Sequence, residues 1–381
     1  MAVRKKIFVD VYYLKVALTG IRSYTLELVE ELKHENINHE IVVYPSFDQM
    51  IEDESYLKSR GIIIRLLFHF KYFWWKQVML PFFVKREKAD ILICPDYLAP
   101  IWPMKTLHKL VVVHDHMFWK YPKHYPKLWR FVYLRLIRWG LTGNAEIITT
   151  SAYAKRTLKP IFKNVNIHYI YQRQRVLADS TTNILHQLNL ESKSFFLHVG
   201  FFEARKDLIC LVRAFHALQS IHHDLKLVLV GKKSYGKTHG VLDEINKYVE
   251  SNKIKEAVIM PGFLPKEDLP TLYKNALAYV FPSKDEGFGI PILEAFQFET
   301  PVIASDAGAL KEIGGEAVYV FPVSNVKELT KSMGRFLNDE TLRQSYILRG
   351  KERSLDFSKG NFGKGFLNLI DNLPKPTKKL F

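Results

Sequence analysis

Cysteine is scarce in this 381-residue sequence, and its scarcity excludes two kinds of protein. The two cysteines, Cys94 and Cys210, lie in different halves of the chain. A scaffold held together by several disulfides and a four-cysteine zinc site both need more thiols than this. We therefore expect a protein of a reducing compartment.

Long hydrophobic runs are missing as well. No stretch of 18 apolar residues occurs, and the best candidate, residues 62–84, is interrupted by Arg65, His69, Lys71 and Lys76. The first residues have a basic head but no apolar run of the length that a signal peptide needs. With 48% hydrophobic and 25% charged residues, the chain is expected to be globular and cytoplasmic, and its length favours two domains.

Acidic residues are rare in one segment of the chain. Residues 55–140 contain 16 Lys and Arg against 4 Asp and Glu, a large share of the total net charge of +16. Such a field attracts polyanions, which include nucleic acid, an anionic membrane surface and phosphorylated substrates. A merely solvated basic surface is the alternative, and charge alone does not choose among these.

Short apolar runs alternate with helical patterns along most of the chain. We expect strands at residues 6–12, 40–44, 62–67, 91–94, 110–113, 146–150, 195–199, 225–230, 257–260, 278–281, 302–304 and 317–321. Helices are expected at residues 24–33, 208–220, 269–275 and 291–298. This alternation is typical of the α/β class with parallel sheets buried on both faces. Two such sets, separated by the polar stretch 172–183, predict two doubly wound domains.

Ligands of doubly wound sheets bind beyond the carboxyl ends of the strands, so residues that follow strands are candidates for the site. In HVGFFEARKDL a strand ends at Val199, Gly200 permits a tight turn, and Arg205 and Lys206 precede a helix. Two cations beside a helix amino end favour a diphosphate, because backbone donors and the helix dipole add to their charge. A solvated helix start is the alternative.

A second cluster, FPSKDEGFGIPILEAF, follows another expected strand. Glu286 begins a glycine-punctuated turn, Pro291 suits the first turn of a helix, and Glu294 is placed in that same turn. Two such carboxylates can hold two parts of one ligand; exposed acids at a helix start are the alternative. No Asp-x-Asp pair is present to hold a nucleotide-bound divalent ion, so no metal site is expected.

Taken together, these motifs carry a family resemblance. VGFFEARKD, VLVGKK, PGFLPKEDLPTLYKNA and EGFGIPILEA occur in the order found in retaining glycosyltransferases of family four, so residues 195–321 resemble their donor domain. The pattern is nearest to that of bacterial-type mannosyltransferases. The resemblance implies the GT-B fold, in which two Rossmann-like domains face each other across a cleft. It implies an acceptor-side domain at 1–173, a donor domain at 174–360, and a helix and tail at 361–381 that cross back.

The amino-terminal half resembles the family more loosely. LTGIRSYTLELVEEL, with Gly20, is similar to the glycine-rich first turn and helix, but Arg22 stands in place of the usual second glycine. His114, after an expected strand, matches a histidine that the family keeps near the donor sugar. At residues 171–174, YQRQ replaces the usual Asn-Gly-Val-Asp.

The resemblance also implies roles. A retaining, metal-independent enzyme would transfer a hexose, mannose from GDP-mannose or else glucose from UDP-glucose, to a glycan or lipid-linked acceptor in cell-surface polysaccharide synthesis, with no cofactor besides this donor. Arg205 and Lys206 would neutralise the departing diphosphate, Glu286 would hold the sugar, Glu294 the ribose, and His114 would approach the sugar. The remaining donor-binding residues would be Gly20, Gly200, Gly262, Phe263, Leu264, Gly287, Phe288, Gly289 and Ile290.

Two other classes of function stay open. A catalytically silent GT-B scaffold that partners another transferase is suggested by Arg22 and the altered 171–174 segment. A basic nucleic-acid-binding protein would explain the charge but not the Glu286 and Glu294 motif.

An aromatic segment precedes the strand expected at 91–94. Trp74, Trp75, Phe82 and Phe83, with Lys71, Lys76, Lys85 and Arg86, have the chemistry of a membrane interface. The similar helix of the family packs beneath the sheet, so we expect most of these aromatic side chains in the core. The basic side chains are left to face anionic lipid, which allows peripheral contact with the inner face of the plasma membrane.

Overall fold

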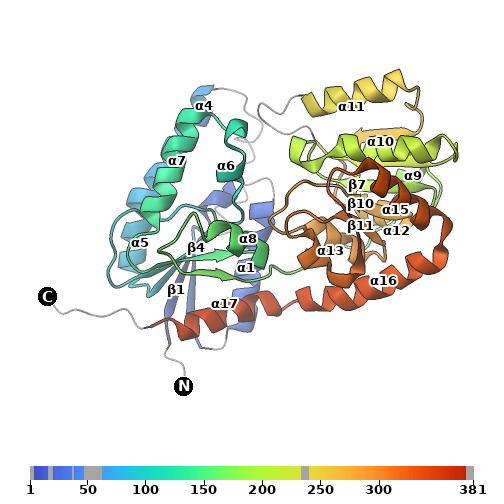
Figure 1. Cartoon of the computed structure of the whole chain (residues 1–381). Helices are drawn as coiled ribbons and strands as arrows, with labels where there is room; N and C mark the ends of the chain where they lie inside the picture. The colour runs from blue at the N-terminus through green and yellow to red at the C-terminus, as the bar shows by residue number, and fades with distance from the viewer. Residues whose placement is uncertain (1–3, 16–19, 37, 47–61, 233–239, 375–381) are drawn as a thin grey trace. The chain divides into compact units, whose positions relative to one another are not determined.

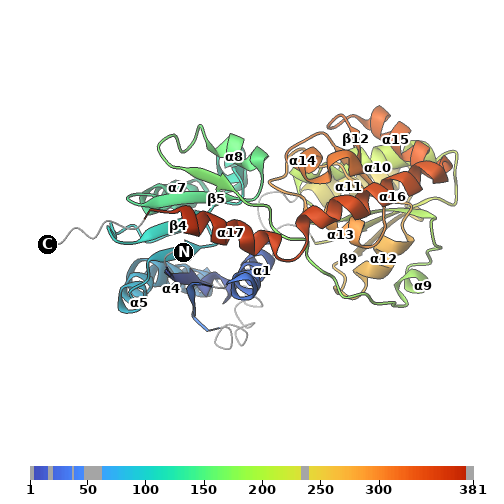
Figure 2. The same cartoon turned by 90° about the horizontal axis from the view of Figure 1, so that it is seen from below.

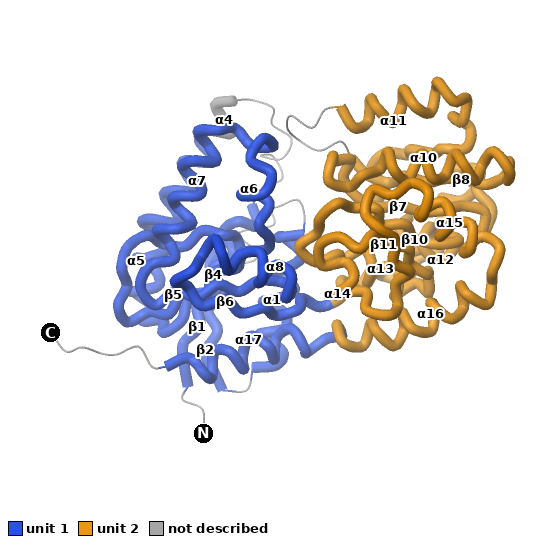
Figure 3. Tube along the Cα trace, viewed as in Figure 1, with its two compact units in different colours: residues 1–173, 358–381 blue, residues 174–357 orange. Residues whose placement is uncertain are grey.

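The protein was analysed as a computed structural model, which describes residues 4–15, 20–36, 38–46, 62–232 and 240–374, without the side chains of 62–66. The chain forms two compact units (Figure 3). Unit 1 contains residues 1–173 and 358–381, and unit 2 contains residues 174–357. The tail expected after residue 374 lies outside the described residues.

Unit 1 is built on a parallel sheet of six strands in the order β2-β1-β3-β4-β5-β6. The strands are β1 (Lys6–Asp10), β2 (Glu40–Tyr44), β3 (Ile91–Cys94), β4 (His108–Val112), β5 (Ala145–Thr149) and β6 (Ile167–Tyr169). Every residue of β3 and β4 is buried, as expected of central strands covered on both faces.

Helices cover both faces of this sheet (Figures 1 and 2). They are α1 (Gly20–Glu35), α4 (Ile62–Trp74), a π-helical stretch (Trp75–Met79), α5 (Leu80–Arg86), α6 (Met117–Lys120), α7 (Lys127–Gly140), α8 (Ala152–Leu158) and α17 (Asn361–Asn372), with short 3-10 turns at Tyr12–Lys15 and Pro122–His124. Helices α1 and α17 share one core with the sheet, where Tyr24 and Leu28 lie with Phe362 and Phe366. The other face is covered by α4, α5, α7 and α8.

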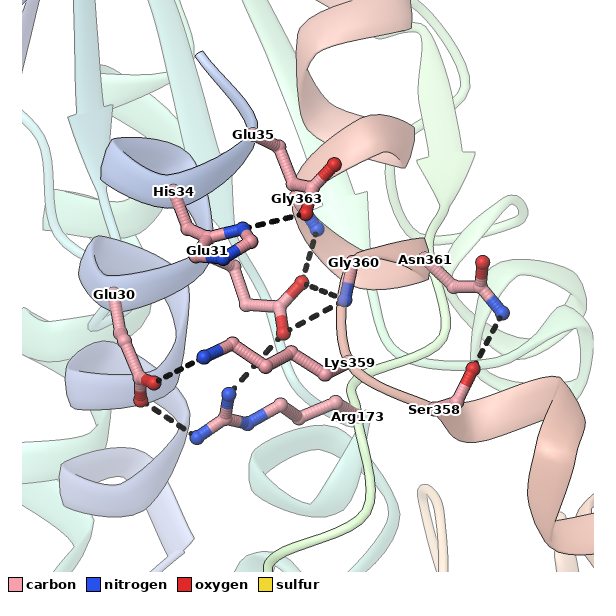
Figure 4. Close-up of polar contacts among 10 residues, drawn as sticks. All are labelled: Glu30, Glu31, His34, Glu35, Arg173, Ser358, Lys359, Gly360, Asn361 and Gly363. Atoms are coloured by element: carbon pink, nitrogen blue, oxygen red, sulfur yellow. Dashed lines mark hydrogen bonds and ion pairs between the residues drawn. The ribbon is translucent and has the colours of Figure 1, made fainter.

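Helix α17 is fixed to α1 by a buried carboxylate (Figure 4). Both oxygens of Glu31 accept from the Gly360 N–H, at 3.0 and 2.7 Å, and Oε2 also accepts from the Gly363 N–H at 3.1 Å. Arg173, the last residue before unit 2, donates to Oε1 of the same carboxylate at 3.2 Å. A Cβ on Gly363 would lie 2.8 Å from the Glu31 carbonyl oxygen, so only glycine allows this approach.

Unit 2 repeats the architecture with the strand order β12-β11-β10-β7-β8-β9. Its strands are β7 (Phe195–Val199), β8 (Lys226–Val230), β9 (Val258–Gly262), β10 (Ala278–Phe281), β11 (Val302–Ser305) and β12 (Val318–Phe321). Its helices are α9 (Ile184–Gln187), α10 (Leu208–Gln219), α11 (Gly240–Ser251), α12 (Leu269–Asn275), α13 (Ile290–Gln297), α14 (Leu310–Gly314), α15 (Val326–Asn338) and α16 (Glu340–Ser354), with 3-10 turns at Ala204–Lys206, Gly315–Ala317 and Leu355–Phe357. Helices α10, α11 and α15 cover one face, while α12 and α13 pack against the other, where Tyr273 meets Tyr279.

Three expectations about the aromatic segment are wrong. Lys76 does not face anionic lipid, because it is fully buried and pairs with Asp10 and Asp96. Residues 62–67 are the first half of helix α4 and not a strand. The mainly apolar pattern, although interrupted by Arg65, His69 and Lys71, does not stop at residue 67 but continues to Trp74 and beyond, which is longer than the four to eight residues of a buried strand. Of the four aromatic side chains expected mostly in the core, Trp75 is buried and Phe83 half-buried, but Trp74 and Phe82 are exposed.

Hydrophobic exposure on these helices does not make them membrane-spanning. In the described parts of the chain, no helix combines the length and apolar character required to cross a bilayer.

Both cysteines are buried and free.

Candidate active site

Glycines end three neighbouring strands at the carboxyl edge of the unit 2 sheet. Gly200 follows β7, Gly231 follows β8, and Gly262 ends β9. A Cβ on Gly231 would lie 1.7 Å from the Gly200 carbonyl oxygen, and the Gly200 N–H donates to the Val230 carbonyl at 2.9 Å. The turns therefore pack backbone against backbone at this edge. Gly231 was missed as a site residue, although VLVGKK contains it.

Gly262 has a different reason for being glycine. A Cβ there would meet no atom within 4 Å, but its φ of +81° lies in the left-handed region. Phe263 beside it is exposed, with the Lys232 ammonium 3.9 Å from its ring centroid, and Leu264 is half-buried. The predicted 262–264 turn thus lies at the same sheet edge as Gly200.

Glu286 is the centre of a charged cluster at this edge. It lies in the loop after β10, while Arg205 and Lys206 come from the turn after β7. Glu286 Oε1 accepts from Arg205 Nη1 at 2.7 Å, from the Lys206 ammonium and from the Ser283 hydroxyl at 2.9 Å. The structure therefore brings together the three residues expected to bind the donor's diphosphate and sugar.

The backbone around Glu286 is tightly constrained. A Cβ on Gly308 would lie 2.4 Å from the Glu286 nitrogen, and the Ala309 N–H donates to the Glu286 carbonyl at 2.9 Å. Across the cluster, the Lys284 N–H donates to the Arg205 carbonyl at 2.6 Å. These contacts fix the loop after β10 against the turn after β7.

Burial shapes the electrostatics of the cluster. Burial alone would raise the pKa of Glu286, but Arg205 and Lys206 outweigh it and lower that pKa to about 2. Burial lowers the pKa of Lys206, although Glu286 opposes this shift. Arg205 is also paired with Glu203, at 2.8 Å. The two cations are therefore balanced by two carboxylates, and any anionic ligand would have to compete with these acids for them.

His198 is a functional candidate that the sequence analysis missed. It is fully buried at the end of β7, where its Nδ1 lies 2.9 Å from the Val280 carbonyl oxygen. A Cβ on Gly200 would lie 3.1 Å from Nε2, and that nitrogen has no hydrogen-bond partner in the described structure. Burial lowers the pKa of His198 to about 4, so the neutral imidazole offers a bare acceptor near the Gly200 turn. In the sequence, its position two residues before Gly200 could have indicated that His198 lies near this turn.

Glu294 lies deeper than expected. It is the fifth residue of α13, in the second turn rather than the first, and is 2% exposed. Its Oε1 pairs with Arg175 Nη2 at 2.6 Å and its Oε2 accepts from the Tyr273 hydroxyl at 3.1 Å. Burial raises the pKa of Glu294, with Arg175 opposing the shift. Arg175, from the stretch expected to be an irregular boundary, was not predicted as a partner.

The glycine-containing turn before α13 is held by packing of Phe288 against Phe357. Phe288 is buried, with its ring edge-on to Phe357 at 5.9 Å between centroids. Gly289 caps the helix at φ +120°, and Ile290 is the first helical residue. Gly287, Phe288, Gly289 and Ile290 therefore surround the amino end of α13, as expected.

The two other predicted residues lie in unit 1. Gly20 begins α1. His114 follows β4 and is half-buried; its Nε2 lies 2.8 Å from the Pro95 carbonyl oxygen, and its ring is edge-on to Tyr24 at 4.7 Å. Burial lowers the pKa of His114 to about 4, so this imidazole is neutral near pH 7. Arg22, in place of the usual glycine, donates to the Leu14 carbonyl at 2.9 Å.

Within the described ranges, no three His, Cys, Asp or Glu side chains gather as metal ligands would.

Comparison with known proteins gives the class of the chain. Residues 18–172 match the family model Glycosyltransferase Family 4, and residues 180–353 match Glycosyl transferases group 1. With two parallel α/β units, the chain has the GT-B fold, and it is a glycosyltransferase of the family-four type. The predictions of fold and of enzyme class are confirmed.

Individual relatives narrow the comparison. O-antigen chain mannosyltransferase B of Escherichia coli is 25% identical over 376 residues, which cover 91% of this chain and 94% of that protein. O-antigen chain mannosyltransferase RfbU of Salmonella typhimurium is 25% identical over 291 residues, covering 74% and 76%. The solved structure of sucrose-phosphate synthase from Thermosynechococcus elongatus has a TM-score of 0.71 at 20% identity, covering 96% of this chain and 98% of that one. This last likeness concerns the fold alone.

Proposed function

We propose that this glycosyltransferase transfers mannose from GDP-mannose, with glucose from UDP-glucose as the second candidate, to a glycan or lipid-linked acceptor in cell-surface polysaccharide synthesis. The observation that carries the proposal is the buried contact of Glu286 with both Arg205 and Lys206 beside the strand-end glycines. The names of the two mannosyltransferase relatives support mannose and a surface polysaccharide.

The cluster suggests how the transfer proceeds. As the bond between sugar and diphosphate breaks, negative charge grows on the leaving phosphate, and Arg205 and Lys206 stabilise it. Glu286 then exchanges its cation contacts for hydroxyls of the sugar, and Glu294 exchanges Arg175 for those of the ribose. His114 approaches the sugar as a neutral imidazole. We propose retention of configuration through displacement on one face, in which the leaving phosphate helps to deprotonate the acceptor.

The donor is identified by ligand-induced stabilisation. Thermal unfolding is followed with GDP, UDP, ADP and their sugars, because a ligand that binds only the native state raises the melting temperature. We expect the largest shift with GDP-mannose, and transfer to an acceptor glycan that survives excess EDTA. Transfer lost with EDTA and restored by Mn²⁺ would contradict the metal-independent mechanism. Nucleotide binding without hydrolysis or transfer of any donor would favour a silent scaffold, and salt-sensitive DNA binding without nucleotide binding would favour a nucleic-acid-binding protein.

Peripheral contact with an anionic membrane on the cytoplasmic side forms part of the proposal. Residues 55–140 carry the net positive excess, and Phe70, Trp74, Phe82 and Phe131 are exposed on helices of this segment. A cation near such a surface contributes about 1 kcal/mol and is screened by salt. Co-sedimentation with liposomes should therefore depend on phosphatidylglycerol and weaken steeply with added salt. Equal binding to neutral liposomes would contradict an electrostatic contact.

A further inference from the structure

A large apolar cavity lies within unit 1. Its volume is about 720 Å³, and its walls come from α4, α7 and the segments that follow β1, β3 and β4. The wall side chains are mainly aliphatic and aromatic, among them Phe68, Phe73, Leu98, Trp129, Val132 and Leu136. A cavity with such a lining stabilises an apolar occupant by removing it from water.

The acidic side chain on the wall is already satisfied. Asp96 is buried; its Oδ1 accepts from Lys76 Nζ and its Oδ2 from the Tyr72 hydroxyl, both at 2.5 Å. Lys76, in the π-helical stretch, also pairs with Asp10 at 2.5 Å. The hydroxyl groups of a sugar bound here would need hydrogen-bond partners, but the Asp96 carboxylate already accepts from Lys76 and Tyr72. The cavity therefore suits hydrocarbon better than a glycan.

Two exposed apolar residues that line the cavity have lysines as neighbours in the sequence. Leu128 and Phe70 line the cavity and are still 76% and 63% exposed, which is unusual for large apolar residues unless they meet a ligand or a partner. Lys71 and Lys127 are exposed next to them in sequence, and neither α4 nor α7 contains an acidic residue. This arrangement complements a molecule with a hydrocarbon chain and a phosphate at one end.

We infer that the cavity between α4 and α7 binds the hydrocarbon chain of a phosphate-bearing lipid acceptor, with the phosphate held by the exposed Lys71 and Lys127. The inference rests on the proposed function, since it names the acceptor class of the same transferase. It implies that acceptors with the same sugar differ in KM according to the length of their chain. Each added methylene that leaves water for the cavity is worth about 0.8 kcal/mol, close to a fourfold gain in affinity.

The test uses the full chain and monomeric farnesyl phosphate as the probe, with inorganic phosphate as the headgroup alone. Val132 lines the cavity and is partly exposed, so Val132→Trp narrows the cavity without disturbing the core. Phe131→Trp is the matched control, because Phe131 is exposed on the same helix but does not line the cavity. Melting temperatures establish that both variants fold.

We expect calorimetry to show farnesyl phosphate binding to the wild type and to Phe131→Trp, at least tenfold weaker binding to Val132→Trp, and much weaker binding of inorganic phosphate throughout. Affinity for GDP or UDP should be the same in all three proteins. Absence of farnesyl phosphate binding, or equal binding to Val132→Trp, overturns the inference, and so does binding to vesicles without binding of the monomer. Nucleotide binding separates the two proposals: if it persists while the lipid fails, only the acceptor assignment is wrong, and if it is absent, the proposed function fails.

Discussion

A single carboxylate oxygen organises the residues expected to carry the chemistry. Oε1 of Glu286 accepts from Arg205, Lys206 and Ser283, which come from two different strand ends. The carboxylate thereby compensates the charge of the buried Lys206 and the half-buried Arg205. In the proposed mechanism, a diphosphate takes over this compensation, and Glu286 is then available to a neighbouring sugar.

Replacing Lys206 by Ala should lower the turnover number much more than the affinity for the donor. The ammonium is worth more when charge accumulates on the leaving diphosphate than in the ground state. Removal of one such stabilising group typically lowers the rate by about a hundredfold. Steady-state transfer kinetics together with calorimetry of donor binding measure the two effects separately. Unchanged turnover would assign Lys206 a purely structural role as the partner of Glu286.

Substitutions of Glu286 and Glu294 should have different effects on transfer and on nucleotide affinity. Glu286→Ala is expected to abolish most transfer while leaving affinity for bare nucleoside diphosphate nearly unchanged, because this acid is assigned to the sugar. Glu294→Ala should weaken that affinity by about tenfold to a hundredfold, the worth of one charge-assisted hydrogen bond. Calorimetry with GDP and UDP on both variants decides the matter. Equal weakening by both substitutions would disprove the division of roles.

Some residue-level features could be predicted from sequence and others could not. Arg205, Lys206 and Glu286 follow strands of one sheet, so spacing and the family motif indicated that they meet. Arg175 pairs with Glu294 across 119 positions of sequence, and it lies in a polar stretch without periodicity. Nothing in the local pattern specifies such a partner. His198 was missed because its bare Nε2 becomes evident only when the neighbouring contacts are known.

At the scale of elements, the contact between α1 and α17 depends on few groups. Glu31→Ala would leave the Gly360 and Gly363 N–H groups and the Arg173 guanidinium without their buried acceptor. We expect this to destabilise unit 1 by about 3 kcal/mol, in the range found when one partner of a buried ion pair is removed. Urea unfolding measures the loss.

Glu35→Ala is the matched control for that substitution. Glu35 lies one turn later on α1 and pairs with His34 at 2.8 Å (Figure 4). It also pairs with Lys364 at 3.5 Å, and both pairs lie near the surface. Surface pairs contribute little to stability, so this variant should unfold close to the wild type. Comparable losses in the two variants would show that Glu31 is not the determining contact.

The strand pattern was largely predictable, since buried parallel strands appear as short apolar runs. Strand β7 has the predicted bounds, and β10 and helix α12 do as well. The segment 62–67 failed because an apolar run has the same appearance in a buried strand and in a helix of high apolar content. Exposure of Trp74 and Phe82 could not be predicted either, because the helix presents more apolar side chains than the sheet can cover.

For the whole molecule, two histidines with a lowered pKa predict loss of stability in acid. His114 in unit 1 and His198 in unit 2 have a pKa of about 4 in the folded protein, below the usual 6.5. The unfolded chain therefore binds more protons, and stability that is complete above pH 6.5 falls as the pH is lowered towards 4. Glu286, with a pKa of about 2 in place of 4.5, continues the fall below pH 4.5.

Urea midpoints measured from pH 7.5 to 4.5 check this expectation. Near pH 5, the slope of the free energy of unfolding against pH should correspond to the uptake of about one proton by each of the two compact units on unfolding. In His198→Phe the stability of unit 2 should become nearly independent of pH over this range, while the stability of unit 1 should still fall because His114 is unchanged. A wild-type curve that is flat between pH 6.5 and 4.5 would contradict the prediction.

The position of α17 also has a consequence for synthesis on the ribosome. Residues 361–372 complete the core of unit 1, yet they are translated only after all of unit 2. Domains generally fold in the order in which they emerge, but here the first unit to emerge leaves the α1 surface around Tyr24 and Leu28 uncovered until the end. Unit 2 can therefore finish folding before unit 1. An unfinished chain that is released before α17 is made carries an exposed apolar face, which is the kind of surface that chaperones bind.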